Sequence, residues 1–307
     1  MGKLLAVTII VISLIIFFDR IKYLTPSSPA PGMINSAAIC RETEAQKKIS
    51  AFRHLINLSP VCYFKNIVWE STLRDQLIKM TKAAPGDWAI VVEDLESGIR
   101  VNLNENAIFY AASLSKIPIL MTVYSQIKTG LIRPEDSVVY LEMDFESGSG
   151  SLQYAPVGEA YSVRELAGRM IRESDNVAKN MLLRKVGYSS VRQLLELNKA
   201  NATELTNNTS TAADVSLLLK IIYSESRKGD PYANEMVDFL STTVFHDRLP
   251  NLLPDEIQVA HKIGTWGETG SFHDCGIIYG RNPYLLCILS QGTASAEAQS
   301  AISQISG

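Results

Sequence analysis

Two residues set three positions apart, Ser113 and Lys116, could together perform nucleophilic chemistry. They open an apolar stretch, Ser113 to Gly130, which predicts a helix ended by glycine. At this spacing both side chains leave the helix on one face. Free N–H groups and the helix dipole at the first turn favour a serine oxygen that becomes anionic, and a lysine kept partly neutral by cationic neighbours can take its proton. The pattern predicts a serine nucleophile with a lysine base.

The same Ser-x-x-Lys pattern occurs again at Ser125-Gln126-Ile127-Lys128. This second serine falls inside the predicted helix, where its hydroxyl has no free N–H groups around it. We therefore interpret it as a decoy. The Lys128-Thr129-Gly130 string that overlaps it is interpreted as a helix C-cap, because lysine favours the last turn and glycine the position after it.

A second lysine, in the string Lys262-Ile263-Gly264-Thr265, lies on a predicted strand. Residues 257–260 alternate as a strand does, and Gly264 would let a ligand lie against the backbone. Lys262 is suited to hold a carboxylate. Ile263 stands where a hydroxyl is expected after the lysine, and Thr265, on the same strand face as Ile263, is the candidate to supply it.

A third string, Ser174-Asp175-Asn176, lies between two predicted helices, Val163 to Arg172 and Val177 to Val186. Taken alone, it is an ordinary helix N-cap, with Ser or Asp before a new helix. Its place between the other two strings favours a site instead. Ser174 would then relay a proton between Lys116, Lys262 and the leaving group, and Asn176 would bind an amide of the substrate.

From about Trp69 to the C-terminus, the chain resembles the class A β-lactamases and their penicillin-binding relatives. The three strings occur in the family's order, and the text around them also matches, in the segments 92–98, 109–113, 170–176 and 273–278. The resemblance implies an α+β fold, in which an antiparallel sheet built from N- and C-terminal strands packs with a helical subdomain.

The same resemblance implies a serine hydrolase that needs no cofactor or metal. Ser113 would attack a β-lactam or a D-alanyl peptide, with Lys116, Ser174 and Lys262 as the other catalytic groups. The N–H groups of Ser113 and Thr265 would form the oxyanion hole. Asn176, Gly264 and Thr265 would bind substrate.

The departures from the family concern the step that frees the acylated serine. Class A β-lactamases carry a glutamate on a long loop after the Ser-Asp-Asn turn, which activates water for this step. The corresponding segment, Leu195 to Asp214, is short, and Glu204 and Glu196 are its candidate carboxylates. The arginine that many members place near the lysine strand is not evident, since Cys275 falls near its position.

Three functions stay open on this basis. The first is β-lactam hydrolysis through a Ser113 acyl-enzyme. The second is a D,D-peptidase or penicillin-binding protein with slow deacylation. The third, of another class, is an inactive membrane-anchored binding module, which Ile263 and the missing arginine would fit.

Composition agrees with a single exported enzyme domain. The chain has 307 residues, 46% of them hydrophobic, and a net charge of -3, which allows one sizeable domain and does not suggest nucleic acid as a partner. We expect a monomer. The four histidines are not spaced as metal ligands; two of them, His261 and His273, flank the predicted site strand and are interpreted as rim or hydrogen-bonded residues.

The N-terminal segment predicts the cellular location of the protein. An apolar run, Leu4 to Phe18, follows Lys3 and indicates a membrane anchor or signal segment over residues 1–24. Residues 25–64 are predicted as a linker and a pre-domain helix, and residues 65–307 as the catalytic domain. We expect an extracytoplasmic protein, anchored to the membrane or, if the segment is cleaved, secreted.

The four cysteines allow three pairings in an exported chain. Cys275 and Cys287 flank a predicted hairpin turn at residues 281–283 and could face each other across strands, while Cys40 and Cys62 bracket a charged segment. Free buried thiols are the alternative. Elsewhere, helices are predicted at 69–82, 213–224, 234–240 and 294–305, and strands at 88–94, 99–103, 257–265, 275–279 and 284–289.

Overall fold

The computed structural model describes the backbone of residues 60–307 and the side chains from residue 70 onward. Helix α3 (Pro60–Ala83) comes first in the described chain. Residues 72–307 form one compact unit, whose start lies close to the domain boundary predicted at residue 65. The predicted anchor, linker and charged segment lie outside the described residues, as does Cys40. Within residues 60–307, no helix combines the length and the apolar character needed to cross a bilayer.

The unit is built on a five-stranded antiparallel sheet, in the order β2-β1-β9-β8-β7. The first two strands, β1 (Asp87–Asp94) and β2 (Arg100–Leu103), precede the helices in sequence, while β7 (Gln258–Trp266), β8 (Ser271–Tyr279) and β9 (Tyr284–Gln291) follow them. β1 pairs along its whole length with β9, so an early and a late strand of the unit are joined in the middle of the sheet. The predicted α+β class and its sheet of N- and C-terminal strands are confirmed.

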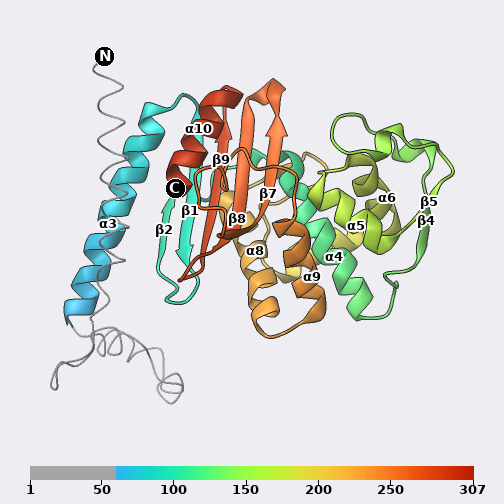
Figure 1. The fold of residues 1–307 in the computed structure, drawn as a ribbon, viewed down its shortest axis with the longest axis horizontal. Helices are drawn as coiled ribbons and strands as arrows, with labels where there is room; N and C mark the ends of the chain where they lie inside the picture. Colours follow the sequence, from blue (N-terminus) through green and yellow to red (C-terminus); the bar gives the residue numbers. More distant parts are fainter. Residues whose placement is uncertain (1–59) are drawn as a thin grey trace. The chain divides into compact units, whose positions relative to one another are not determined.

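Helices cover both faces of this sheet, which explains why its strands are apolar on both sides. α10 (Ser295–Ser306) packs on one face and α8 (Ala212–Arg227) on the other (Figure 1). Alternate residues of β1 serve the two sides: Val91 joins the core that faces α8, whereas Ile90 is buried on the opposite face. β7 is the edge strand, so one of its sides is free to pair with something other than a strand.

The helical part lies beside β7 and surrounds a central helix, α4 (Lys116–Lys128) (Figure 1). α4 is buried on nearly all sides, which fits a run of apolar residues without a polar stripe. Thr129 and Gly130, with Gly130 at φ 73°, end it as the C-cap that the sequence predicted. The remaining helices around it are α5 (Val163–Arg172), α6 (Asn176–Val186), α7 (Tyr188–Leu197) and α9 (Pro231–Ser241).

Helix α7 and the short strands were not predicted. Strand β3 (Phe109–Tyr110) pairs with β6 (Thr209–Ser210), and β4 (Ser137–Val139) pairs with β5 (Ala160–Ser162). Pairs this short carry no readable periodicity, because two or three residues cannot establish an alternation. The β3–β6 pair ties the segment before Ser113 to the end of the short loop that follows α7.

Candidate active site

The segment that carries Ser113 is a single turn of 3-10 helix, η2 (Ala112–Ser115), which runs directly into α4. The helix predicted to begin at Ser113 therefore begins with a tighter turn, and Lys116 is its first α-helical residue. Ala112 has a left-handed backbone, with φ 49°, which a non-glycine residue rarely adopts. This conformation turns the chain from strand β3 into the helix and sets the position of Ser113.

Lys116 is at the centre of a hydrogen-bond cluster although it is 1% exposed. Its Nζ lies 3.0 Å from Ser113 Oγ, 3.1 Å from Ser174 Oγ and 2.7 Å from Asn176 Oδ1, and it also donates to the Ser174 carbonyl. The pKa of Lys116 is lowered well below its ordinary value, first by burial and then by the positive charge of Lys262. Burial and a second cation thus favour the neutral amine, the form that can accept a proton.

Lys262 reaches the same cluster from strand β7. Its Nζ donates to Ser174 Oγ at 3.0 Å and to the Ile263 carbonyl at 3.1 Å. Burial lowers its pKa to about 7, with the nearby Asp274 carboxylate opposing and the Arg248 guanidinium adding to the decrease. The four groups predicted from distant stretches, Ser113, Lys116, Ser174 and Lys262, are therefore in one place.

The Ser174-Asp175-Asn176 turn is both a helix N-cap and part of the cluster. Asp175 forms the cap, and Ser174 and Asn176 bind the lysine. Asp175 is the N-cap of α6, and its Oδ1 accepts from Ala178 N at 2.8 Å. Ser174 has a left-handed backbone, with φ 56°, which aims its hydroxyl and its carbonyl at the lysines. Asn176 donates from Nδ2 to the Ser147 carbonyl at 3.1 Å while its Oδ1 holds Lys116.

Gly264 lets β7 approach the nucleophile segment closely. A Cβ at this position would lie 2.9 Å from the Ala111 carbonyl oxygen and 3.3 Å from Leu114 Cγ, so any side chain would push the two elements apart. Thr265 follows on the edge strand. The backbones of Ser113 and Thr265, predicted to form the oxyanion hole, thus belong to two elements in direct contact.

Arg248 is a site residue that sequence reasoning missed. It lies in the loop after α9, is 2% exposed, and donates from Nη1 to the carbonyls of Gly264 (3.0 Å) and His273 (2.6 Å) and from Nη2 to Thr265 Oγ1 (2.6 Å). The sequence shows no arginine at the family's usual place near the lysine strand, but Arg248 brings a guanidinium to that strand. The guanidinium comes from another part of the chain, and the sequence around residue 248 contains no motif that indicates a site residue.

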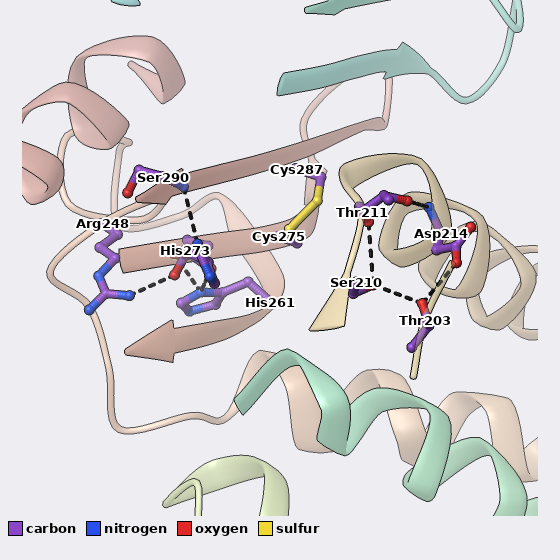
Figure 2. Close-up of a disulfide and its surroundings, with 11 residues drawn as sticks. Thr203, Ser210, Thr211, Asp214, Arg248, His261, His273, Cys275, Cys287 and Ser290 are labelled. Atoms are coloured by element: carbon purple, nitrogen blue, oxygen red, sulfur yellow. Dashed lines mark hydrogen bonds and ion pairs between the residues drawn. A yellow bond between two sulfur atoms is a disulfide. The ribbon is translucent and has the colours of Figure 1, made fainter. Parts of the chain in front are cut away.

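Both histidines that flank the site strand are buried rather than at the rim (Figure 2). His273 accepts from Ser290 N at its Nδ1 (3.1 Å), and its Nε2 donates to the Tyr110 carbonyl (2.8 Å), so it joins β8, β9 and the segment before the nucleophile. Burial lowers its pKa to about 4. His261 Nδ1 lies 2.8 Å from Asp274 Oδ1.

The short loop after α7 is closed by its own polar cluster, drawn on the right of Figure 2. Thr203 Oγ1 contacts Ser210 Oγ at 2.8 Å and donates to Asp214 Oδ2 at 2.9 Å. Glu204 lies at the surface of this loop, where its carboxylate accepts from Asn207 Nδ2. Glu196 is on α7 and exposed. The loop is fixed by Asp214, and both candidate carboxylates face solvent.

Cys275 and Cys287 form a disulfide between neighbouring positions of β8 and β9 (Figure 2). This settles one of the pairings that the sequence left open. Within residues 60–307, no group of three or more His, Cys, Asp and Glu side chains is placed to hold a metal ion. Two surface cavities, of about 300 and 180 Å³, contain none of the cluster's groups and are lined in part by Lys220 and by Trp88.

Residues 72–307 match the model of the β-lactamase enzyme family, and the chain belongs to that family. It is 24% identical over 272 residues to a carbapenem-hydrolysing β-lactamase, KPC, of Klebsiella oxytoca, an alignment that covers 79% of this chain and 90% of that one. It is also 24% identical to β-lactamase VEB-1 of Pseudomonas aeruginosa, over 73% of this chain and 85% of that one.

Solved structures agree on the fold. That of PBP-A superposes with a TM-score of 0.72 at 22% identity and covers 76% of this chain and 93% of that chain. An ancestral class A β-lactamase gives a TM-score of 0.70 at 24% identity, over 76% of this chain and 97% of that chain. The resemblance drawn from the three sequence motifs is confirmed.

Proposed function

We propose that this protein is a serine hydrolase that is acylated by β-lactams at Ser113. The observation that carries the proposal is the distance of 3.0 Å between Ser113 Oγ and Lys116 Nζ, in a cluster where burial and Lys262 favour a neutral Lys116. A serine hydroxyl becomes a nucleophile when an adjacent base takes its proton, and this amine is the adjacent base.

Counting hydrogens supports the direction of that proton transfer. Two partners of Lys116 Nζ, the Ser174 carbonyl and Asn176 Oδ1, can only accept. A neutral amine has two N–H groups and one lone pair. With both N–H groups directed at these acceptors, the lone pair points at a serine hydroxyl and can receive the Ser113 proton.

After attack, the proton must reach the leaving nitrogen. Ser174 Oγ lies within hydrogen-bond distance of both lysines, so it can take a proton from one group as it gives its own to the substrate. The carboxylate of the substrate would bind two positive groups, Lys262 and Arg248, and the hydroxyl of Thr265. The N–H groups of Ser113 and Thr265 would bind the carbonyl oxygen.

The experiment that tests this function is covalent labelling. Purified protein is incubated with a fluorescent penicillin and the adduct is measured by gel fluorescence and intact mass. Labelling of the wild type and none of Ser113→Ala is expected, with Ser125→Ala as the matched control that labels normally. Equal labelling of wild type and Ser113→Ala would overturn the proposal.

Slow deacylation, as in a penicillin-binding protein or D,D-peptidase, is a second candidate for the fate of the adduct. It is favoured by the short loop, whose Glu204 carboxylate is at the surface and bonded to Asn207. One similar structure is an acyl-enzyme complex of a PBP-A mutant with penicillin G. The lifetime of the adduct separates the two: seconds indicate a β-lactamase and hours a penicillin-binding protein.

Both features that favoured the binding-module alternative have a counterpart in the site. Arg248 supplies the positive charge whose absence had favoured an inactive protein, and Thr265 supplies a hydroxyl beside Ile263. A folded wild-type protein that is neither labelled by penicillin nor able to hydrolyse it would support this alternative.

We also propose an extracytoplasmic location, anchored through residues 1–24. The Cys275–Cys287 disulfide supports it, because such bonds persist in oxidising compartments. Protease accessibility in intact cells, compared with cells that express residues 25–307, tests this; protection of the full chain would contradict it.

A further inference from the structure

An aromatic pair borders the candidate site at the end of β7. Trp266, the last residue of that strand, has a ring whose centroid lies 5.7 Å from that of Tyr110, at an interplanar angle of 41°. Tyr110 is itself held in place, since it pairs with Thr209 and its carbonyl accepts from His273. Even so, Trp266 remains 41% exposed. One part of the indole is fixed against a rigid partner, and the rest is open to a ligand.

The strand alternation places this indole on the nucleophile's side of β7. Side chains two apart share a face, so Trp266 lies on the same face as Gly264, whose missing Cβ would meet the Ala111 carbonyl and Leu114. It lies about 7 Å along the strand from Gly264, a distance that the side chain of an acyl group on Ser113 can span.

Two positive groups reach β7 before its end. By the same alternation Lys262 shares the face of Gly264 and Trp266, whereas the Arg248 guanidinium is bonded to a side chain of the opposite face. Thr265 alternates with Trp266, and its Oγ1 receives the Arg248 guanidinium. A substrate lying along edge strand β7 would therefore meet the cations beside residues 262–265 and the exposed aromatic surface at the end of the strand. Its carboxylate would go to Arg248 and Thr265, which leaves its acyl side chain towards Trp266.

We propose that Trp266, supported by Tyr110, binds an aromatic group on the acyl side chain of the substrate and so sets the preference among acyl donors. The inference rests on the proposed function and adds the chemical class of the side chain. A ring stacked on a preordered indole gains contact area at a small cost in conformational entropy.

The test compares two penicillins that share the nucleus and the carboxylate: benzylpenicillin, with an aryl side chain, and 6-aminopenicillanic acid, with none. The second-order rate constant of Ser113 acylation is measured by intact mass. Trp266→Ala is expected to reduce it roughly tenfold for benzylpenicillin, the scale of one aromatic contact, and to leave it unchanged for 6-aminopenicillanic acid. Trp266→Phe should lie between wild type and Trp266→Ala.

Tyr188→Ala is the matched control, because Tyr188 is an exposed aromatic residue on α7 and should not affect either compound. An equal loss for both penicillins with Trp266→Ala would mean damage to the strand, and no loss for either would mean that the indole is not used; each result overturns the inference. If the wild type is acylated by neither compound, the proposed function itself fails, which is a distinct outcome.

Discussion

The Nζ atoms of Lys116 and Lys262 both lie within hydrogen-bond distance of one oxygen, the Ser174 hydroxyl, at 3.1 and 3.0 Å. The two amines come from a helix and from a strand, and both are 1% exposed. Burial lowers the pKa of both amines; the positive charge of Lys262 lowers that of Lys116 further, and the Arg248 guanidinium that of Lys262. Burial and the cationic neighbour Lys262 favour the neutral Lys116 amine that the proposed acylation requires.

Replacing the base by a side chain that stays protonated should slow acylation. A guanidinium at Lys116→Arg stays protonated and cannot take a proton near neutral pH, so the labelling rate should fall by about 10²- to 10⁴-fold. The measurement is penicillin labelling over time, with circular dichroism to confirm folding. Lys128→Arg, which changes the second Ser-x-x-Lys string, should label like wild type. A Lys116→Arg variant as fast as wild type would show that another group is the base.

The acylation rate should pass through a maximum with pH. Its rising limb reports loss of the proton from Lys116, whose pKa burial and Lys262 lower. Its falling limb reports loss of the Lys262 charge, with a pKa of about 7 in the free protein, after which the substrate carboxylate is held less well. Lys262→Arg should move the falling limb to higher pH, because a guanidinium does not titrate there. A rate that keeps rising to pH 9 in the wild type would contradict the role of Lys262.

Glu204 should not control the lifetime of the acyl-enzyme. Its carboxylate is at the surface and bonded to Asn207, so Glu204→Gln should leave the deacylation rate within about twofold of wild type, far below the 10²- to 10⁴-fold share of a general base. The check is the decay of the penicillin adduct by mass spectrometry, with Glu196→Gln as the matched variant. A markedly longer-lived adduct in Glu204→Gln alone would identify Glu204 as the activator of water.

His273 should make the fold sensitive to acid. Its pKa is about 4 in the folded protein against an ordinary 6.5, so the unfolded chain takes up this proton first as pH falls. The free energy of unfolding should therefore fall between about pH 6.5 and pH 4, by up to roughly 3 kcal/mol. Above about pH 6.5 His273 is neutral in both the folded and the unfolded chain and does not change the free energy of unfolding.

Urea unfolding at pH 7.5 and pH 5 measures this effect. His273→Gln can still donate to the Tyr110 carbonyl and should show a smaller difference between the two pH values, whereas His246→Gln, at an exposed position, should behave like wild type. An unchanged difference in His273→Gln would assign the acid sensitivity to other groups.

The sequence by itself determined the elements that carry chemistry. The apolar run after Ser113, the polar turn at Ser174 and the alternating strand at Lys262 are local patterns, and local patterns are what periodicity and capping preferences record. Their order along the chain also indicated the family and the α+β class. Edges of elements were less well defined: Ser113 lies in a 3-10 turn rather than in the α-helix.

Only the tertiary structure decided which distant groups meet. Arg248 reaches Thr265 from a loop, His273 supports Tyr110 from within the sheet, and Trp266 packs on Tyr110 across two elements. None of these contacts can be recognised in the nearby sequence, because each joins residues that are distant in the chain and meet only where β7 and β8 pack against the nucleophile segment. The burial that lowers the pKa of both lysines arises from the same packing, since a side chain loses its water only when separate parts of the chain close around it.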